Sequence, residues 1–425
     1  MAREMKDSEI EWIGEIPKEW IINTVFQLFT QVKNKNTNMR EKNLLSLSYG
    51  KIIRKSIDTV GGLLPENFEG YNIIEENDIV LRLTDLQNDQ KSLRVGYARE
   101  RGIVTSAYCT IRTRNMNAGK YLYYCLYSFD IAKGFYGMGA GIRQGLNWDG
   151  LKGLKIIMPP DNEQKQIVEF LDLCSAELDN VLEKTRASIE EYKKLKQAVI
   201  TQAVTKGVRG DREMKDCGIE WNSQIPVEWD SINPKALFRQ RKDKAFEGEK
   251  QLTASQQHGI MFQSDYMELT GTKVVTVEKD FDILKHVEAG DFVISMRSFQ
   301  GGLEYSELSG SISSAYVMLV PNLELVYPRF YRWLLKSEVY IRALQSTSNM
   351  VRDGQAMRYS NFLQVRLYVV PMEEQEEIAQ YLDEKCKIID NLIAKKEQYL
   401  SEIENYKKSL IYEYVTGKKE VPQNC

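Results

Sequence analysis

Residues 162–172 have the sequence NEQKQIVEFLD, and residues 373–383 have the similar sequence EEQEEIAQYLD. Each segment lies at the start of a stretch of more than 40 residues without glycine or proline. Prolines precede both stretches, and Gly207 and Gly417 follow them, which is typical of the two ends of a helix. The sequence therefore predicts two long helices, over residues 161–206 and 372–416.

Apolar residues recur along both stretches at alternating intervals of four and three residues, which favours a coiled coil. We expect the two helices to pack against each other in antiparallel orientation; the alternative is that each packs only on its own globular domain. In the second helix, Lys385 and Lys396 also fall on the predicted seam. The apolar and aromatic seam residues are Ile167, Leu171, Leu178, Val181, Tyr192, Leu195, Ile378, Leu382, Ile389, Leu392, Ile403 and Leu410.

A second repeated block precedes each globular segment. Residues 5–20, MKDSEIEWIGEIPKEW, match residues 214–229, MKDCGIEWNSQIPVEW, at ten of sixteen positions. The chain is therefore a tandem duplication of a globular segment followed by a helix. We expect an α+β fold in which two similar globular domains are separated by an antiparallel coiled coil, with internal pseudo-two-fold symmetry. The predicted segments are domain 1 (1–160), helix 161–206, domain 2 (207–371), helix 372–416 and a tail (417–425).

The charge balance bears on nucleic-acid binding. The chain has 57 Lys and Arg against 60 Asp and Glu, a net charge of −3, without the basic excess common in nucleic-acid-binding proteins. Residues 1–160, however, carry 22 basic against 18 acidic side chains, whereas residues 372–425 carry 8 against 12. The acidity lies mainly in the helices, so the sum does not exclude DNA binding by the domains.

Several classes of protein do not fit the sequence. The N-terminus lacks the apolar core of a signal peptide, and no stretch approaches 18 apolar residues. The six cysteines are scattered, which argues against a disulfide framework or a metal cluster and favours a cytoplasmic protein. The only Pro-Pro pair, at 159–160, lies outside any [DNS]-P-P-[YF] methyltransferase tetrad, and no phosphate-binding loop motif occurs. We therefore expect a protein that is not itself an enzyme and binds no metal.

In its doubled IEW…IP.EW blocks and its doubled Pro, EQ..I and LD helix starts, the sequence resembles the specificity subunit of type I restriction–modification systems. The resemblance covers nearly the whole chain. It implies two target-recognition domains, each recognising one half of a bipartite, asymmetric sequence in double-stranded DNA. It further implies that the helices set the spacer between the half-sites and dock two methyltransferase subunits. Adenine-N6 methylation and ATP-dependent cleavage would reside in the methyltransferase and restriction/translocase subunits, which would bind S-adenosylmethionine, ATP and Mg; this chain would carry no cofactor.

Arginine is the commonest reader of guanine in the major groove, and lysine more often contacts phosphate. The alternative for each candidate is a solvated surface charge, and a coiled-coil scaffold with protein-binding domains is the alternative function. The four recurring tryptophans, at 12, 20, 221 and 229, we expect in the domain cores. The candidate DNA-binding residues are Arg82, Arg99, Arg101, Arg143, Asn147, Arg239, Arg241, Lys242, Arg297, Arg352 and Arg358.

Overall fold

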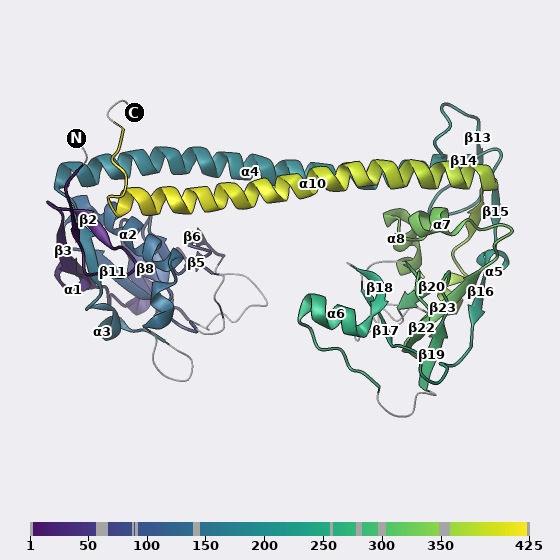
Figure 1. Ribbon diagram of the computed structural model, residues 1–425, viewed down its shortest axis with the longest axis horizontal. Coiled ribbons are helices and arrows are strands. Elements are labelled where there is room, and N and C mark those ends of the chain that lie inside the picture. Colours follow the sequence, from purple (N-terminus) through teal and green to yellow (C-terminus); the bar gives the residue numbers. More distant parts are fainter. Residues whose placement is uncertain are drawn as a thin grey trace. The chain divides into compact units, whose positions relative to one another are not determined.

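In the computed structural model, the chain folds into two compact units (Figure 1). Unit 1 consists of Met1–Arg186 and Gln398–Cys425, and unit 2 of Ala187–Glu397. Each unit thus combines one globular domain with one end of each long helix. The structure describes residues 3–56, 67–86, 89, 92–138, 145–255, 258–277, 283–295, 303–347 and 358–422.

The centre of unit 1 is an antiparallel four-stranded sheet in the order β4-β11-β8-β9. Ile111 in β11 pairs with Gln31 on one side and Ile79 on the other. Strand β8 is buried along its whole length, as its run of Ile, Val and Leu requires. The strands are β1 (Met5–Asp7), β2 (Glu15–Pro17), β3 (Ile21–Thr24), β4 (Phe29–Gln31), β5 (Leu45–Ser48), β6 (Lys51–Arg54), β7 (Asn72–Ile74), β8 (Ile79–Leu81), β9 (Val95–Tyr97), β10 (Gly102–Val104), β11 (Cys109–Thr113) and β12 (Lys155–Met158).

The remaining strands of unit 1 form two-stranded antiparallel pairs, β1 with β2, β3 with β12, β5 with β6 and β7 with β10. Helices α2 (Gly119–Ile131) and α4 (Asp161–Lys206) contribute Leu122 and Leu171 to the same core as Phe29 of β4. The short helices of unit 1 are α1 (Val25–Leu28), α2 (Gly119–Ile131) and α3 (Trp148–Leu151), with 3-10 turns at Thr37–Met39, Met116–Ala118 and Gly134–Gly137.

Unit 2 repeats this topology. Its four-stranded sheet has the order β16-β23-β20-β21, and its pairs are β13 with β14, β15 with β24, β17 with β18 and β19 with β22. Each matches a pairing of unit 1, so the duplication extends to the strand order. The strands are β13 (Met214–Asp216), β14 (Gln224–Pro226), β15 (Asp230–Ile232), β16 (Phe238–Arg241), β17 (Leu252–Ser255), β18 (Gly259–Phe262), β19 (Leu284–Val287), β20 (Phe292–Ser295), β21 (Glu304–Tyr305), β22 (Gly310–Ser313), β23 (Tyr316–Pro321) and β24 (Leu367–Val369).

Unit 2 differs from unit 1 in its helices. Helix α6 follows β18 and has no buried side chain, whereas α7 and α8 bury Tyr331 and Tyr340 in the core. Of the recurring tryptophans, Trp20 and Trp229 are fully buried and Trp12 and Trp221 pack against the cores. The short helices are α5 (Pro234–Leu237), α6 (Gln263–Thr270), α7 (Pro328–Leu335), α8 (Glu338–Ser346) and α9 (Tyr359–Phe362).

The two long helices are α4 (Asp161–Lys206) and α10 (Met372–Val415). Acidic side chains lie in the first turn of both, where they interact favourably with the helix dipole. Gly207 and Gly417 follow the helix ends with φ of +77° and +70°, a conformation that favours glycine. None of the helices that the structure describes is long and apolar enough to cross a membrane.

The helices pack side by side in each unit (Figure 1). In unit 1, Lys407 Nζ lies 2.7 Å from Asp179 Oδ1, and Arg186 Nη2 lies 2.6 Å from Glu404 Oε1. Because the numbering rises along α4 while it falls along α10, the helices are antiparallel there. In unit 2 the corresponding ion pair joins Lys196 to Asp390 at 2.7 Å. The predicted antiparallel helix pair is confirmed.

The buried stripe of these helices differs from the predicted seam. Val181, Leu195 and Leu392 are exposed, by 36%, 48% and 37%, while the adjacent Leu182 is buried. In each helix, one interval between neighbouring inward-facing residues is four residues long, where the strict alternation of four and three predicts an interval of three. The reason is that a straight helix has 3.6 rather than 3.5 residues per turn. In α10 the extra residue places Cys386 inside and Lys385 outside.

The other seam candidates are at least partly buried, but in two settings. At the helix ends, Ile167, Leu171 and Leu410 belong to the core of unit 1, and Ile378 and Leu382 to that of unit 2. Between the ends, Ile389 and Ile403 are buried, and Leu178 and Tyr192 are half-buried. The helices therefore pack on their domains at the ends and on each other in between, which combines the two predicted alternatives.

Candidate nucleic-acid interface

A half-buried ion pair between Arg3 and Glu163 fixes the globular domain of unit 1 to the start of α4. Glu163 accepts hydrogen bonds from Arg3 Nη2 at 2.8 Å and from Trp20 Nε1 at 2.9 Å. Arg3 also pairs with Glu19, and the hydrogen bond to Glu163 raises the pKa of its guanidinium. Next to this cluster, Gln164 Nε2 donates to the carbonyl of Pro159 at 2.8 Å. We call Arg3, Glu19, Trp20 and Glu163 the unit 1 lock.

Unit 2 contains the same cluster, with Arg212, Glu228, Trp229 and Glu374 in the corresponding places. Trp229 Nε1 donates to Glu374 Oε2 at 3.0 Å. Arg212 donates to Glu374 and, at 2.6 Å, to Glu228 Oε2. Glu374 is fully buried, whereas the side chain of Glu163 is 22% exposed. This unit 2 lock fixes the second globular domain to the start of α10.

Two aspartates, which lie nine residues or about two and a half turns after the lock glutamates, make a second attachment. Asp172 of α4 accepts from Tyr124 at 2.7 Å and from Lys120 at 2.5 Å, both on α2. Asp383 of α10 accepts from Arg332 at 3.0 Å and from Trp333 at 2.8 Å, both on α7. The repeated Glu, Gln and Asp of the two helix starts therefore orient each domain relative to its helix.

The central sheets hold one matched arginine–aspartate pair each. In unit 1, Arg112 binds the buried Asp78 through Nε at 2.6 Å and Nη2 at 2.8 Å. In unit 2, Arg241 binds the buried Asp291 through Nε at 2.6 Å and Nη2 at 3.1 Å. The arginines come from different strands, β11 and β16, and their charges are neutralised by carboxylates. Arg241, a candidate DNA reader, thus has its guanidinium engaged within the sheet.

The candidate residues of unit 1 lie in different settings. Arg101 pairs with Glu41 at 3.0 Å and Glu75 at 2.9 Å, and Arg82 lies 3.7 Å from Asp89. Asn147 caps α3 by accepting from Gly150 N. Arg99 is exposed and lines a cavity. Arg143 lies outside the described residues.

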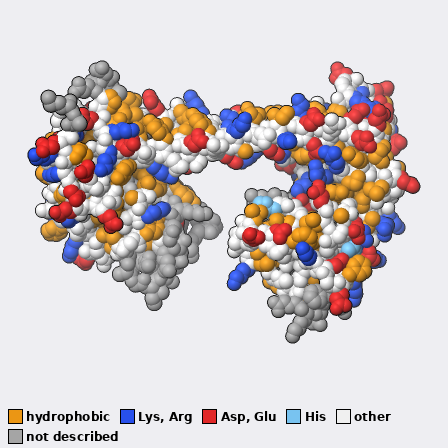
Figure 2. Space-filling model, viewed as in Figure 1, with side chains coloured by type: hydrophobic (Ala, Val, Ile, Leu, Met, Phe, Trp, Pro, Cys, Tyr) orange, Lys and Arg blue, Asp and Glu red, His pale blue; other side chains and the backbone are white. Residues whose placement is uncertain are grey.

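In unit 2, Arg239 and Lys242 are exposed at and just after β16. Arg358 is exposed at the start of α9, where its backbone N–H donates to Asn361 Oδ1 at 3.1 Å. Arg297 and Arg352 lie outside the described residues. On the face drawn in Figure 2, basic and acidic side chains are interspersed over both units. The DNA-binding list remains a prediction.

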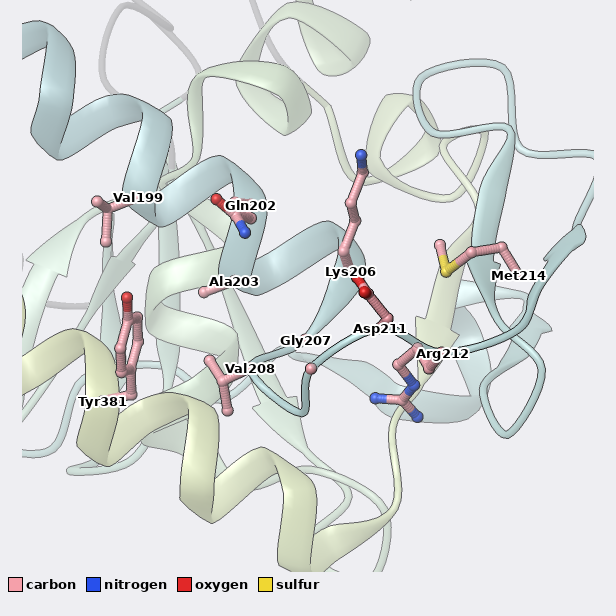
Figure 3. A pocket seen from close by; sticks show the side chains of 11 residues that line it. Val199, Gln202, Ala203, Lys206, Gly207, Val208, Asp211, Arg212, Met214 and Tyr381 are labelled. Atoms are coloured by element: carbon pink, nitrogen blue, oxygen red, sulfur yellow. The ribbon is translucent and has the colours of Figure 1, made fainter.

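A cavity of about 620 Å³ adjoins the unit 2 lock, where α4 ends and the chain leads into β13. Tyr381 of α10 and the last turns of α4 line it (Figure 3). Its charged lining residues are Lys206, Asp211 and Arg212, and Arg212 is already paired within the lock. The described lining residues include no histidine, cysteine or serine.

The comparisons with known proteins agree with this architecture. Residues 17–191 match the family model described as type I restriction modification DNA specificity domain. The chain is 24% identical to the putative type I restriction enzyme MjaX specificity subunit of Methanocaldococcus jannaschii, with 96% of both chains covered. The chain is therefore similar, over nearly its whole length, to type I restriction enzyme specificity subunits.

Two further similarities agree with these matches. The MjaVIII specificity subunit of the same organism is 23% identical over 96% of this chain and 94% of that one. A chain from a structure addressing complex assembly and conformational transition of the type I R-M system has the same fold. The TM-score is 0.68 at 14% identity, and the match covers 95% of this chain and 99% of that chain. The resemblance noted in the sequence is confirmed.

The sequence places Trp20 and Trp229 in the domain cores, but it predicts no role for the charged residues of the two locks. The signal was present, because Trp20 and Trp229 recur at an offset of 209 residues and Glu163 and Glu374 at 211. A buried indole N–H needs an acceptor, and the recurring carboxylate of the other block could supply it. Arg3 and Arg212 recur at the same offset as the tryptophans and complete both clusters.

Proposed function

We propose that this chain selects the DNA sequence on which a type I complex acts, and that units 1 and 2 each recognise one half of a bipartite, asymmetric target. The observation that carries the proposal is the repeated strand order and repeated lock, combined with different side chains on the two sheets. Two similar scaffolds with different surfaces suit two half-sites of different sequence. Methylation of adenine and ATP-dependent cleavage then belong to partner subunits, which bind S-adenosylmethionine, ATP and Mg.

Long-read sequencing of methylated bases in the host, with and without this gene, tests the proposal. We expect a split motif that contains N6-methyladenine to disappear when the gene is deleted. Replacing residues 1–160 by the corresponding segment of another family member should change one half of the motif and leave the other half unchanged. Changes in both halves, or in neither, would contradict the assignment of one half-site to each unit.

The long helices separate the two half-sites in this proposal. A helix rises 1.5 Å per residue, so inserting or deleting one turn in both α4 and α10 should change the number of unread base pairs between the half-sites. The bases recognised on either side should stay the same. A change of the recognised bases at constant spacing would contradict this role.

The same helices dock the two methyltransferase subunits. Helix α10 carries exposed apolar and aromatic side chains at intervals of four, seven and seven residues, which is the spacing of a helix-packing stripe. These are Ile388, Leu392, Tyr399 and Tyr406, exposed by 55%, 37%, 49% and 59%. Such a stripe fits a partner helix in a groove.

Substitution of this stripe tests the docking. Leu392→Glu combined with Tyr399→Glu should abolish co-purification of the methyltransferase subunits while leaving the helicity of the chain unchanged. Ser401→Glu, on a different face of the same helix, is the matched control and should retain the partner. Equal binding by both variants would exclude this face as the docking surface.

A further inference from the structure

A cavity of about 580 Å³ in unit 1 is rich in tyrosine and lies beside the β5–β6 hairpin, β9, α2 and the two long helices. Its walls contain four tyrosines from β9 and α2, and the rings of Tyr123 and Tyr97 have their centroids 5.3 Å apart. Tyr123 lies 5.8 Å from Tyr127 by the same measure. The site is thus a continuous aromatic surface rather than a set of isolated side chains.

The charges around the cavity leave a positive excess. Lys120 is neutralised by Asp172 at 2.5 Å, and Lys407 by Asp179 at 2.7 Å. Two further cations line the cavity, Lys51 at the start of β6 and Arg99 just after β9, and both are exposed. Neither makes an ion pair with any residue that the structure describes. The cavity therefore favours an anion.

The hydroxyl groups of the cavity are of two kinds. Tyr97 donates to Asn77 Oδ1 and Tyr124 to Asp172 Oδ1, both at 2.7 Å. Within the described residues, the hydroxyls of Tyr123 and Tyr127 have no protein partner. Burial raises the pKa of Tyr127 to about 12 and raises that of Tyr123 as well, so both remain protonated hydrogen-bond donors at neutral pH.

We propose that Lys51, Arg99, Tyr123 and Tyr127 bind a backbone phosphate of DNA beside the half-site of unit 1. Two unpaired cations and two free hydroxyl donors match the unprotonated oxygens of a phosphodiester, and the tyrosine rings offer an apolar surface to the adjacent sugar. Such a contact fixes the position of the DNA without carrying sequence information. The inference rests on the proposed DNA-recognition function and adds one contact point to it.

The contact belongs to unit 1 alone. In the repeat, Tyr121 corresponds to Tyr331, since their hydroxyls donate to the matching strands β12 and β24. The same offset of 210 residues places Trp333 and Ser337 where unit 1 has Tyr123 and Tyr127. Trp333 donates to Asp383, and Ser337 is buried as the cap of α8, so unit 2 does not present this donor set.

The test measures binding of the full chain to duplex DNA that carries its motif, over 50 to 200 mM salt. The double variant Tyr123→Phe/Tyr127→Phe retains the rings, and Lys51→Ala/Arg99→Ala removes the charges. For the charge variant we expect the slope of log K against log salt to fall by about one, which makes the loss of affinity over this range roughly 3.5-fold smaller. The phenylalanine variant should bind several-fold more weakly, and both should leave the methylated motif unchanged.

The controls separate this inference from the proposed function. Arg114→Ala removes an exposed arginine of unit 1 that lies outside the cavity and pairs with no acidic residue in the described part of the chain, and it should leave the slope unchanged. A wild-type slope and affinity in both cavity variants would overturn the inference, as would an altered motif, which would indicate base recognition. Loss of methyltransferase co-purification with unchanged DNA binding would assign the cavity to a protein partner instead. Absence of any specific DNA binding by the wild type would refute the proposed function itself.

Discussion

Replacing Glu374 by alanine tests the energetic role of the unit 2 lock. The carboxylate is fully buried, and its removal leaves Arg212, only 10% exposed, with a partner on one side alone. The indole N–H of Trp229 also loses its acceptor. Breaking a buried pair from one side typically costs about 3–5 kcal/mol, because a buried charge remains uncompensated. We expect a loss of stability of this size, confined to unit 2.

The matched variant in unit 1 is Glu163→Ala. Here the carboxylate is 22% exposed and Arg3 18% exposed, so water compensates part of the loss. We expect about 1–3 kcal/mol, the usual cost of leaving a partly accessible charged group without its hydrogen-bond partner. The larger stability loss expected for Glu374→Ala than for Glu163→Ala follows from burial alone, since the partners of the two carboxylates are otherwise equivalent.

Hydrogen exchange of backbone amides measures both effects within one chain. Glu374→Ala should raise the exchange rate of the protected amides of β13–β24, and Glu163→Ala those of β1–β12. Glu374→Gln, which retains an acceptor for the indole, should lie between wild type and Glu374→Ala. Equal costs for both alanine variants, or a cost below about 1 kcal/mol for Glu374→Ala, would refute the reasoning.

Three further predictions follow from single positions. Leu182→Ala should cost about 2–4 kcal/mol and Val181→Ala less than about 1 kcal/mol in urea denaturation, because only Leu182 is buried; the reverse order would restore the predicted seam. Gly207→Ala should lower the melting temperature, since its φ is +77° and the new Cβ would lie 2.6 Å from a carboxylate oxygen of Glu374; an unchanged melting temperature would contradict this. Burial raises the pKa of Asp130 to about 6, above its value in the unfolded chain, so the folded state binds the proton more tightly. The free energy of unfolding therefore falls, by up to about 3 kcal/mol, as the pH rises from about 4 to about 6. Asp130→Asn should flatten that pH dependence in denaturation midpoints, and an unaltered profile would exclude Asp130 as its source.

The sequence allowed the doubled architecture and the two long helices to be predicted, because these depend on local signals. Freedom from glycine and proline, stop signals at Gly207 and Gly417, and a long apolar stripe all act within one segment. The phase of the stripe could not be predicted as well. Apolar residues stand at both 181 and 182, and the 3.6-residue turn of a straight helix, which a strict alternation of four and three does not follow, buries Leu182 rather than Val181.

Which charged side chains are paired with one another was the feature least predictable from the sequence. Arg241 and Asp291 are 50 residues apart, and nothing in their local sequence shows that they pair across a sheet. The same holds for Arg101, whose partners Glu41 and Glu75 come from two other segments. A count of basic residues by segment cannot separate an engaged arginine from one such as Arg99 that is available to a ligand. Only the tertiary arrangement makes that distinction.

The two units also differ in when the ribosome supplies their parts. Unit 2 is one continuous stretch, Ala187–Glu397, whereas unit 1 needs the last turns of α10: Tyr121 donates to the carbonyl of Val415 at 3.0 Å, and Lys418 donates to that of Glu15. At 5–20 residues per second, about 210 residues separate the two parts of unit 1 by roughly 10–40 s of synthesis. A nascent chain can therefore complete its second domain before its first, and premature termination within α10 would leave the first domain without its closing segment.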